Sequence, residues 1–225
     1  MHILAVDTST DICSVAVLKD GEVLGERSQR VRTGHSGTIL NLIDDVLVSS
    51  GLNKKDINLI ATGIGPGSFT GIRIGIATAR GLAAALNCKV KGVCTLDAVA
   101  ANAPETDKHV MPVLDARKGE IFCALYDKDM NRLSPQVNIE PAQVKGMITK
   151  PTLFTGNAIA LYDNIFSNSL GSLYQAADKD LWYPRAAVIG RLALDTAFAV
   201  NDINPVYIRA SDATLLLKRI SPQGW

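Results

Sequence analysis

One pattern of strands and turns occurs twice in the chain, and a duplication of this kind leaves few possible folds. An apolar stretch at residues 3–6 predicts a strand that ends at Asp7, before a polar turn and a return strand. Residues 111–114 predict a second strand, which ends at Asp115 before another turn and return strand. The two aspartates are separated by close to half of the 225 residues. This spacing indicates two structurally similar domains.

After these hairpins, each half of the chain alternates between helices and strands, as an α/β fold does. In the first half we expect a third strand, a helix, a strand, a helix, a strand and a short helix at residues 22–30, 39–47, 59–64, 70–86, 89–93 and 96–103. In the second half we expect strands at residues 120–126, from 132 onward and at 152–155, and helices from 141, from 157 and at about 185–199. We therefore predict two βββαβα domains, residues 1–104 and 105–225, with the second degenerate because its periodicity is weaker.

Two tandem domains of this plan occur in actin-like and sugar-kinase-like ATPases, so the predicted fold class is a pair of actin-like (ASKHA or ribonuclease H-like) domains. In such ATPases the two hairpins face each other and grip phosphates, and the acidic residue of each turn holds a metal ion or its water. Asp7 and Asp115 occupy these positions, and Thr8 and Ser68 complete the predicted pocket, a vestigial site for phosphate or nucleotide. The other interpretation is simple turn chemistry, because aspartate side chains readily bond to their own backbone.

A glycine-rich segment, residues 65–75, connects a predicted strand to a predicted helix. Such a turn leaves backbone N–H groups free at the helix start, where Ser68 or Thr70 can cap the helix. The segment lacks the lysine of a Walker A loop and the spacing of a dinucleotide-binding fingerprint. Anion binding and close backbone packing therefore both stay open as its purpose.

Charge, cysteines and histidines exclude several classes of protein. The net charge is +1 and there is no long run of lysine or arginine, which argues against strong non-specific binding to nucleic acid. No stretch is apolar enough to span a membrane, and the start of the chain does not resemble a signal peptide. The four cysteines lack metal-ligand spacing and the three histidines form no local pair. We expect a cytoplasmic protein without a metal site.

Five segments together resemble the bacterial TsaB (YeaZ) family, and they occur in family order along almost the whole chain. The glycine-rich segment is the most specific of them, the stretch from about residue 139 to 180 matches loosely, and the tail after residue 209 departs from the family's more polar tail. The segments are ILAVDTST with CSVA (residues 3–10 and 13–16), HS (35–36), GPGSFTGIRIG (65–75), DARKGE (115–120) and PVYIR (205–209).

The resemblance implies a protein without catalysis of its own. TsaB-like proteins bind TsaD, a paralogue of the same fold, and act with the ATPase TsaE. The complex transfers a threonylcarbamoyl group to the adenosine next to the tRNA anticodon. By this resemblance the partners are a TsaD-type paralogue, a TsaE-type ATPase and, through the complex, tRNA. The chain would need no cofactor of its own, although ATP or ADP could bind at the interface of the complex.

The residues independently favour a non-catalytic protein. TsaD-like enzymes bind a metal through a helical His-x-x-x-His pair, whereas this chain has His35 followed by Ile39 at the corresponding helix start. One imidazole cannot make that site. The nearest relic of an adenosine-binding glycine loop in the second half is at residues 155–157. We therefore predict no catalytic residues and no hydrolysis of ATP by the isolated chain.

Two helices offer a predicted partner surface. Residues 39–47 have a broad apolar face, and the next helix carries a series of small residues that would let another helix approach closely. Two such helices from each of two related chains could form a four-helix interface, with TsaD or in a homodimer. The alternative is that both helices simply cover their own sheet. The predicted interface residues are His35, Ile39, Leu42, Ile43, Val46, Phe69, Gly71, Gly75, Thr78 and Gly81.

Two other functions stay open. The first is an ATP-dependent small-molecule kinase of the same fold, which needs a working adenosine loop and a substrate carboxylate. The second is a metallopeptidase, which needs a metal pair or an activated nucleophile. The tail, residues 210–225, is rich in leucine. We expect it to pack on the first domain or on a partner, because an isolated apolar segment is unusual.

Overall fold

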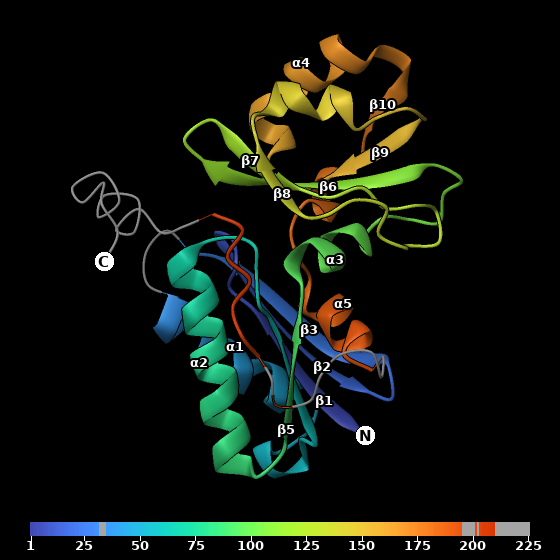
Figure 1. Ribbon diagram of the computed structural model, residues 1–225. Coiled ribbons are helices and arrows are strands. Elements are labelled where there is room, and N and C mark those ends of the chain that lie inside the picture. Colours follow the sequence, from blue (N-terminus) through green and yellow to red (C-terminus); the bar gives the residue numbers. More distant parts are fainter. Residues whose placement is uncertain (32–34, 195–200, 202, 210–225) are drawn as a thin grey trace, which may run out of the picture.

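The computed structural model describes residues 1–31, 35–194, 201 and 203–209, which form two five-stranded mixed sheets with helices against them (Figure 1). The first sheet has the order β3-β2-β1-β4-β5. Its strands are β1 (His2–Asp7), β2 (Ile12–Lys19), β3 (Glu22–Arg30), β4 (Leu59–Gly63) and β5 (Lys89–Val93). The second sheet has the order β10-β9-β6-β7-β8. Its strands are β6 (His109–Arg117), β7 (Glu120–Cys123), β8 (Val137–Ile139), β9 (Thr152–Thr155) and β10 (Tyr174–Ala176).

The two sheets have the same topology, which confirms the predicted duplication. In the first, β1 is antiparallel to β2 and parallel to β4, and in the second, β6 is antiparallel to β7 and parallel to β9. The register pairs Asp7 with Ser14 at the end of the first hairpin and Asp115 with Ile121 in the second. The two predicted aspartates therefore occupy equivalent places, and the α/β, actin-like fold class is confirmed.

Helices cover both faces of the first sheet. The α-helices in the described part of the chain are α1 (His35–Ser49), α2 (Phe69–Leu86), α3 (Thr95–Ala100), α4 (Ile159–Leu170) and α5 (Ala186–Leu192). Alternate residues of β1 point to opposite faces. Leu4 and Val6 pack with α1 and α2, whereas Ile3 and Ala5 pack with α3 and α5. The sheet is therefore buried on both sides, which explains its nearly continuous apolar strands.

The second domain differs from the sequence prediction in several details. The segment that starts at Pro141 is a 3-10 helix, Pro141–Gly146, and not an α-helix. The third strand begins at Val137, because the chain around Arg132 makes only an isolated bridge to Tyr126. The strand β10 was not predicted. Aromatic rings fill the core of this domain, with the Phe154 centroid 5.2 Å from that of Phe166.

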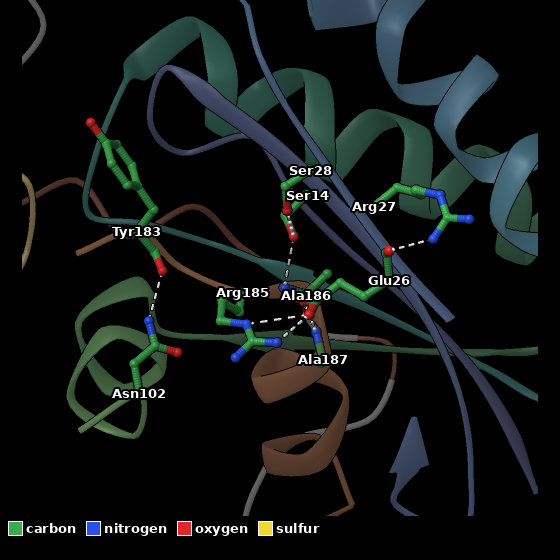
Figure 2. A network of polar contacts seen from close by, with 9 residues as sticks. All are labelled: Ser14, Glu26, Arg27, Ser28, Asn102, Tyr183, Arg185, Ala186 and Ala187. Atoms are coloured by element: carbon green, nitrogen blue, oxygen red, sulfur yellow. Dashed lines mark hydrogen bonds and ion pairs between the residues drawn. The ribbon is translucent and has the colours of Figure 1, made fainter. Parts of the chain in front are cut away.

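The last helix returns to the first sheet. Although α5 follows the second domain in sequence, it packs on β1 and β2. Figure 2 shows how its start is held: the Ser14 hydroxyl accepts the Ala186 N–H at 3.0 Å, and the Glu26 carboxylate accepts the Ala187 N–H at 3.0 Å. Glu26 also pairs with Arg185 at 2.6 Å. The boundary between residues 104 and 105 stays a prediction, but α5 belongs to the layers of the first sheet.

The helix predicted at about 185–199 is described as far as residue 194, and the tail at 210–225 lies outside the described residues. Among the described helices, none combines the length and the apolar character needed to cross a membrane.

Candidate functional site: the cavity between the domains

A cavity of about 810 Å³ lies between the two domains. The first hairpin contributes residues 9–11 to its wall, and the second hairpin contributes residues 114–118. The glycine-rich segment and residues 206–209 supply most of the rest, and Asn157 reaches it from the start of the α4 region. The cavity is therefore where the two predicted hairpins meet, as the duplicated plan requires.

The glycine-rich segment packs closely against the first hairpin. The Thr8 hydroxyl donates a 2.7 Å hydrogen bond to the Gly71 carbonyl, and the Ser68 N–H donates to the Ser9 carbonyl at 2.7 Å. A Cβ on Gly71 would overlap the Thr8 carbonyl oxygen, and one on Gly75 would lie 2.6 Å from the Thr8 Oγ1. These glycines therefore serve the close approach of backbone and helix, which was one of the two purposes left open.

Ser68 caps α2, as predicted. Its side chain accepts a 3.2 Å hydrogen bond from the Gly71 N–H, and the Ser68 residue is itself exposed on the cavity wall. One of the free N–H groups of the helix start is thus already satisfied within the chain.

Asp7 lies beneath the cavity wall and does not line it. The carboxyl is fully buried; its Oδ1 accepts hydrogen bonds from the Ser9 N–H at 3.0 Å and the Ser9 hydroxyl at 2.8 Å. Its Oδ2 has no hydrogen-bond partner among the described residues and sits where a side chain at Gly63 would be. Burial raises the pKa of Asp7 to about 7, although the Ser9 hydrogen bonds oppose this. Thr8 is also buried.

Asp115 lines the cavity, but its carboxylate is engaged by its own hairpin. The Oδ1 accepts the Arg117 N–H at 2.8 Å, and the Oδ2 lies 3.3 Å from the Arg117 guanidinium. The Asp115 N–H donates to the Asn157 side chain at 2.9 Å. Of the four predicted pocket residues, the structure therefore places Ser68 and Asp115 on the cavity, and Asp7 and Thr8 under it.

Cations outnumber carboxylates on the cavity wall. The cations are Arg73, Arg117, Lys118 and Arg209, and the carboxylates are Asp11 and Asp115. Arg73 lies over the Phe69 ring, 3.8 Å from its centroid, and donates a 2.9 Å hydrogen bond to the Tyr207 hydroxyl. The Phe69 and Tyr207 rings are 4.9 Å apart. The predicted pocket did not include these cations or Tyr207, although the motifs at residues 65–75, 115–120 and 205–209 contain all of them.

Most of the predicted partner-interface residues are buried in the protein itself. Ile39, Leu42, Ile43 and Val46 lie in the core of the first domain, against its own sheet. Gly71 and Gly75 face the first hairpin, as described above. This corrects the expectation that these six residues present a surface to a partner, because none of them is accessible. The side chain of His35 lies outside the described residues.

The outer face of α2 is a different surface, and it is accessible. It carries small residues at helical spacing: Thr70, Ala77, Gly81 and Ala84 are exposed, and Thr78 is half-buried beside them. A Cβ on Gly81 would meet no atom within 4 Å. Phe69 lies at the start of the same helix and is 36% exposed. Among the predicted interface residues, Phe69, Thr78 and Gly81 therefore stay available.

Across the described ranges, no group of three or more histidine, cysteine, aspartate or glutamate side chains is arranged to hold a metal ion. The four cysteines are free thiols, and burial raises the pKa of Cys13, Cys94 and Cys123 to about 12. Within that part of the molecule, the acidic and thiol groups give no sign of a metal centre or a reactive thiolate.

Comparison with known proteins connects this geometry to one family. Residues 27–208 match the family model described as TsaD, tRNA N6-adenosine threonylcarbamoyltransferase. The protein named tRNA threonylcarbamoyladenosine biosynthesis protein TsaB from Haemophilus influenzae is 32% identical over 226 residues, covering 93% of this chain and 94% of that protein. The Escherichia coli protein of the same name is 44% identical over 133 residues, covering 58% of this chain and 57% of that protein.

Solved structures agree with the sequence comparison. YeaZ from Pseudomonas aeruginosa superposes with a TM-score of 0.75 at 26% identity, covering 92% of this chain and 99% of that one. Component A of (R)-2-hydroxyglutaryl-CoA dehydratase from Acidaminococcus fermentans has a TM-score of 0.55 at 11% identity, covering 85% of this chain and 97% of that one. At that identity the second likeness shows the fold alone.

Proposed function

Because the chain belongs to the TsaB (YeaZ) family, we propose that it takes part in forming threonylcarbamoyladenosine in tRNA, as a non-catalytic partner of a TsaD-type enzyme. The observation that carries this proposal is the similarity, over more than nine-tenths of both chains, to a relative named as a TsaB biosynthesis protein. The structure adds physical support for each half of it: the absence of catalysis and the presence of a partner.

The state of the two hairpin carboxylates supports a protein that does not itself catalyse. An actin-like ATPase needs its hairpin carboxylates turned toward the phosphates and free to hold a metal ion or water. Here Asp7 is buried under the cavity wall, and Asp115 is bound to Arg117. A kinase of this fold would need such a free carboxylate, and a metallopeptidase would need a ligand cluster, so no observation favours either alternative.

The exposed face of α2 supports a helical partner. Small side chains allow another helix to come close, and a partner built on the same fold would offer a helix at the corresponding place. We propose that this face, with Phe69, Thr78 and Gly81, binds the TsaD-type paralogue, and that the same face pairs two copies when the partner is absent. A TsaE-type ATPase and tRNA would then join through the complex, with ATP or ADP at its interface.

A bulky charge on this face is expected to block the complex. In Ala77→Arg, the long side chain would stand between the two helices, so the affinity for the TsaD-type protein of the same genome should fall at least about 10-fold. The matched control is Ala160→Arg, an exposed alanine of α4 in the second domain. Isothermal titration calorimetry measures both affinities, and circular dichroism checks that both variants fold. Equal affinities for Ala77→Arg and the parent protein would refute this choice of surface.

A further inference from the structure

Residues 203–209, here called the C-terminal strap, form a further connection between the two domains, after the return of the chain to α5. The strap lies beside α2 and leads from the first domain toward the second (Figure 1). Four of its residues, 206–209, form part of the wall of the cavity between the domains. The strap thus touches both domains and the space that separates them.

The N-terminal half of the strap is fixed to the first domain. Ile203 is fully buried in the core with α1 and α2, and its carbonyl accepts a 3.0 Å hydrogen bond from Arg80. The Val206 N–H donates to the Ile64 carbonyl at 2.8 Å. The chain passes so close to Gly65 that a Cβ there would lie 2.7 Å from the Val206 carbonyl oxygen. Gly65 has φ +102°, which also favours glycine.

The end of the strap binds the second hairpin. The Arg209 guanidinium donates to the Ala116 carbonyl at 2.9 Å and to the Glu120 carboxylate at 3.2 Å. The Arg209 side chain is only 16% exposed, so water screens this charged contact less than it screens a surface pair. Ile208, one residue earlier, packs on the apolar cluster that includes Leu114 and Phe122.

Other contacts between the domains lie around α3, and Leu114 and Phe122 of that apolar cluster also reach the cavity wall. The Tyr126 hydroxyl donates to Asp97 at 2.6 Å, and the Asn102 side chain donates to the Tyr183 carbonyl at 2.6 Å (Figure 2 shows the second of these). Apolar residues of α3 and β6 share one cluster, which makes this side a broad joint. On the cavity wall, the strap supplies hydrogen bonds that cross to the second domain, those of Arg209 to Ala116 and Glu120.

We propose that the C-terminal strap is a latch that holds the two domains closed over the cavity, with the α3 side as the pivot. The anchored half, up to Tyr207, stays with the first domain, and Arg209 is the point of release. When Arg209 leaves Ala116 and Glu120, the second hairpin moves away from the glycine-rich segment and the cavity opens. The proposal concerns this chain alone and does not depend on the proposed function.

The test measures the separation of the domains in the full chain. Spin labels at Val48→Cys in α1 and Leu161→Cys in α4 would report it, because these positions are 80% and 61% exposed. Cys88 is the native thiol that is not buried, so Cys88→Ser serves as the background. In Arg209→Met we expect a broader label-to-label distance distribution than in the parent protein.

The matched control is Arg191→Met, which removes a guanidinium whose hydrogen bond, to the Gly21 carbonyl, stays within the layers of the first sheet. It should leave the label-to-label distance distribution unchanged. Glu120→Gln is the second variant, and it should broaden the distances less, because the Ala116 carbonyl bond stays. If Arg209→Met folds and gives the parent protein's distance distribution, the strap is not a latch. If Arg209→Met does not fold, the same result for Glu120→Gln leads to the same conclusion.

Discussion

Gly71→Ala is expected to destabilise the protein by at least about 4 kcal/mol, the range that only severe backbone or core clashes reach. The added Cβ would overlap the carbonyl oxygen of Thr8, and that is a backbone atom of the first hairpin which cannot rotate away. Either α2 or the hairpin would have to move, and the 2.7 Å hydrogen bond from Thr8 to Gly71 would break with it.

Gly81→Ala is the matched control, because it makes the same change in the same helix. Gly81 is exposed and has open space around it, so the alanine should instead stabilise the protein by about 0.5–1 kcal/mol through its higher helix propensity. Denaturant unfolding followed by circular dichroism gives both free energies. A cost for Gly71→Ala no larger than about 1 kcal/mol would contradict the close packing of this turn.

The second large effect concerns Asp7 and depends on pH. Its pKa is about 7 in the folded protein and near 3.8 in an unfolded chain, so between these values the folded state holds a proton that the unfolded state has lost. Stability therefore falls as the pH rises from about 4 to about 7. Between pH 5 and pH 8, the free energy of unfolding falls by an amount on the order of 3 kcal/mol because of this one group.

Asp7→Asn should remove this loss. The amide oxygen can still accept the two Ser9 hydrogen bonds, and the side chain has no charge to bury. The free energy of unfolding, measured at pH 5 and pH 8, should thus differ less in the variant than in the parent protein. Asp129→Asn, at an exposed aspartate, is the control and should keep the parent's pH dependence. A parent protein equally stable at both pH values would show that Asp7 is not held protonated.

The parts of the fold that the sequence predicted well are those where an apolar run ends at a turn. The strand β4 and the two hairpins after β1 and β6 fall within a few residues of the prediction. The strand β10 has only three residues, two of them exposed, so no hydrophobic pattern marks it. At Pro141 the sequence predicts a helix start, and the structure has a 3-10 helix there with Pro141 in its first turn.

The candidate site was harder to predict, because it depends on which way side chains point. A carboxylate at the end of a strand can face a cavity or lie under a glycine, and sequence does not distinguish Asp115 from Asp7 in this respect. The apolar face of α1 is likewise the same pattern whether it covers its own sheet or a partner. Arg209 reaches the second hairpin from the far end of the chain, which no local pattern encodes.

The most direct test of the proposed function is to co-express this chain with the TsaD-type protein of the same genome. Size-exclusion chromatography with light scattering, run with and without ATP, then gives the mass of the complex. We predict a complex that contains both proteins in equal numbers and forms at the expense of any homodimer. Two separate peaks under both conditions, with each protein folded, would contradict it.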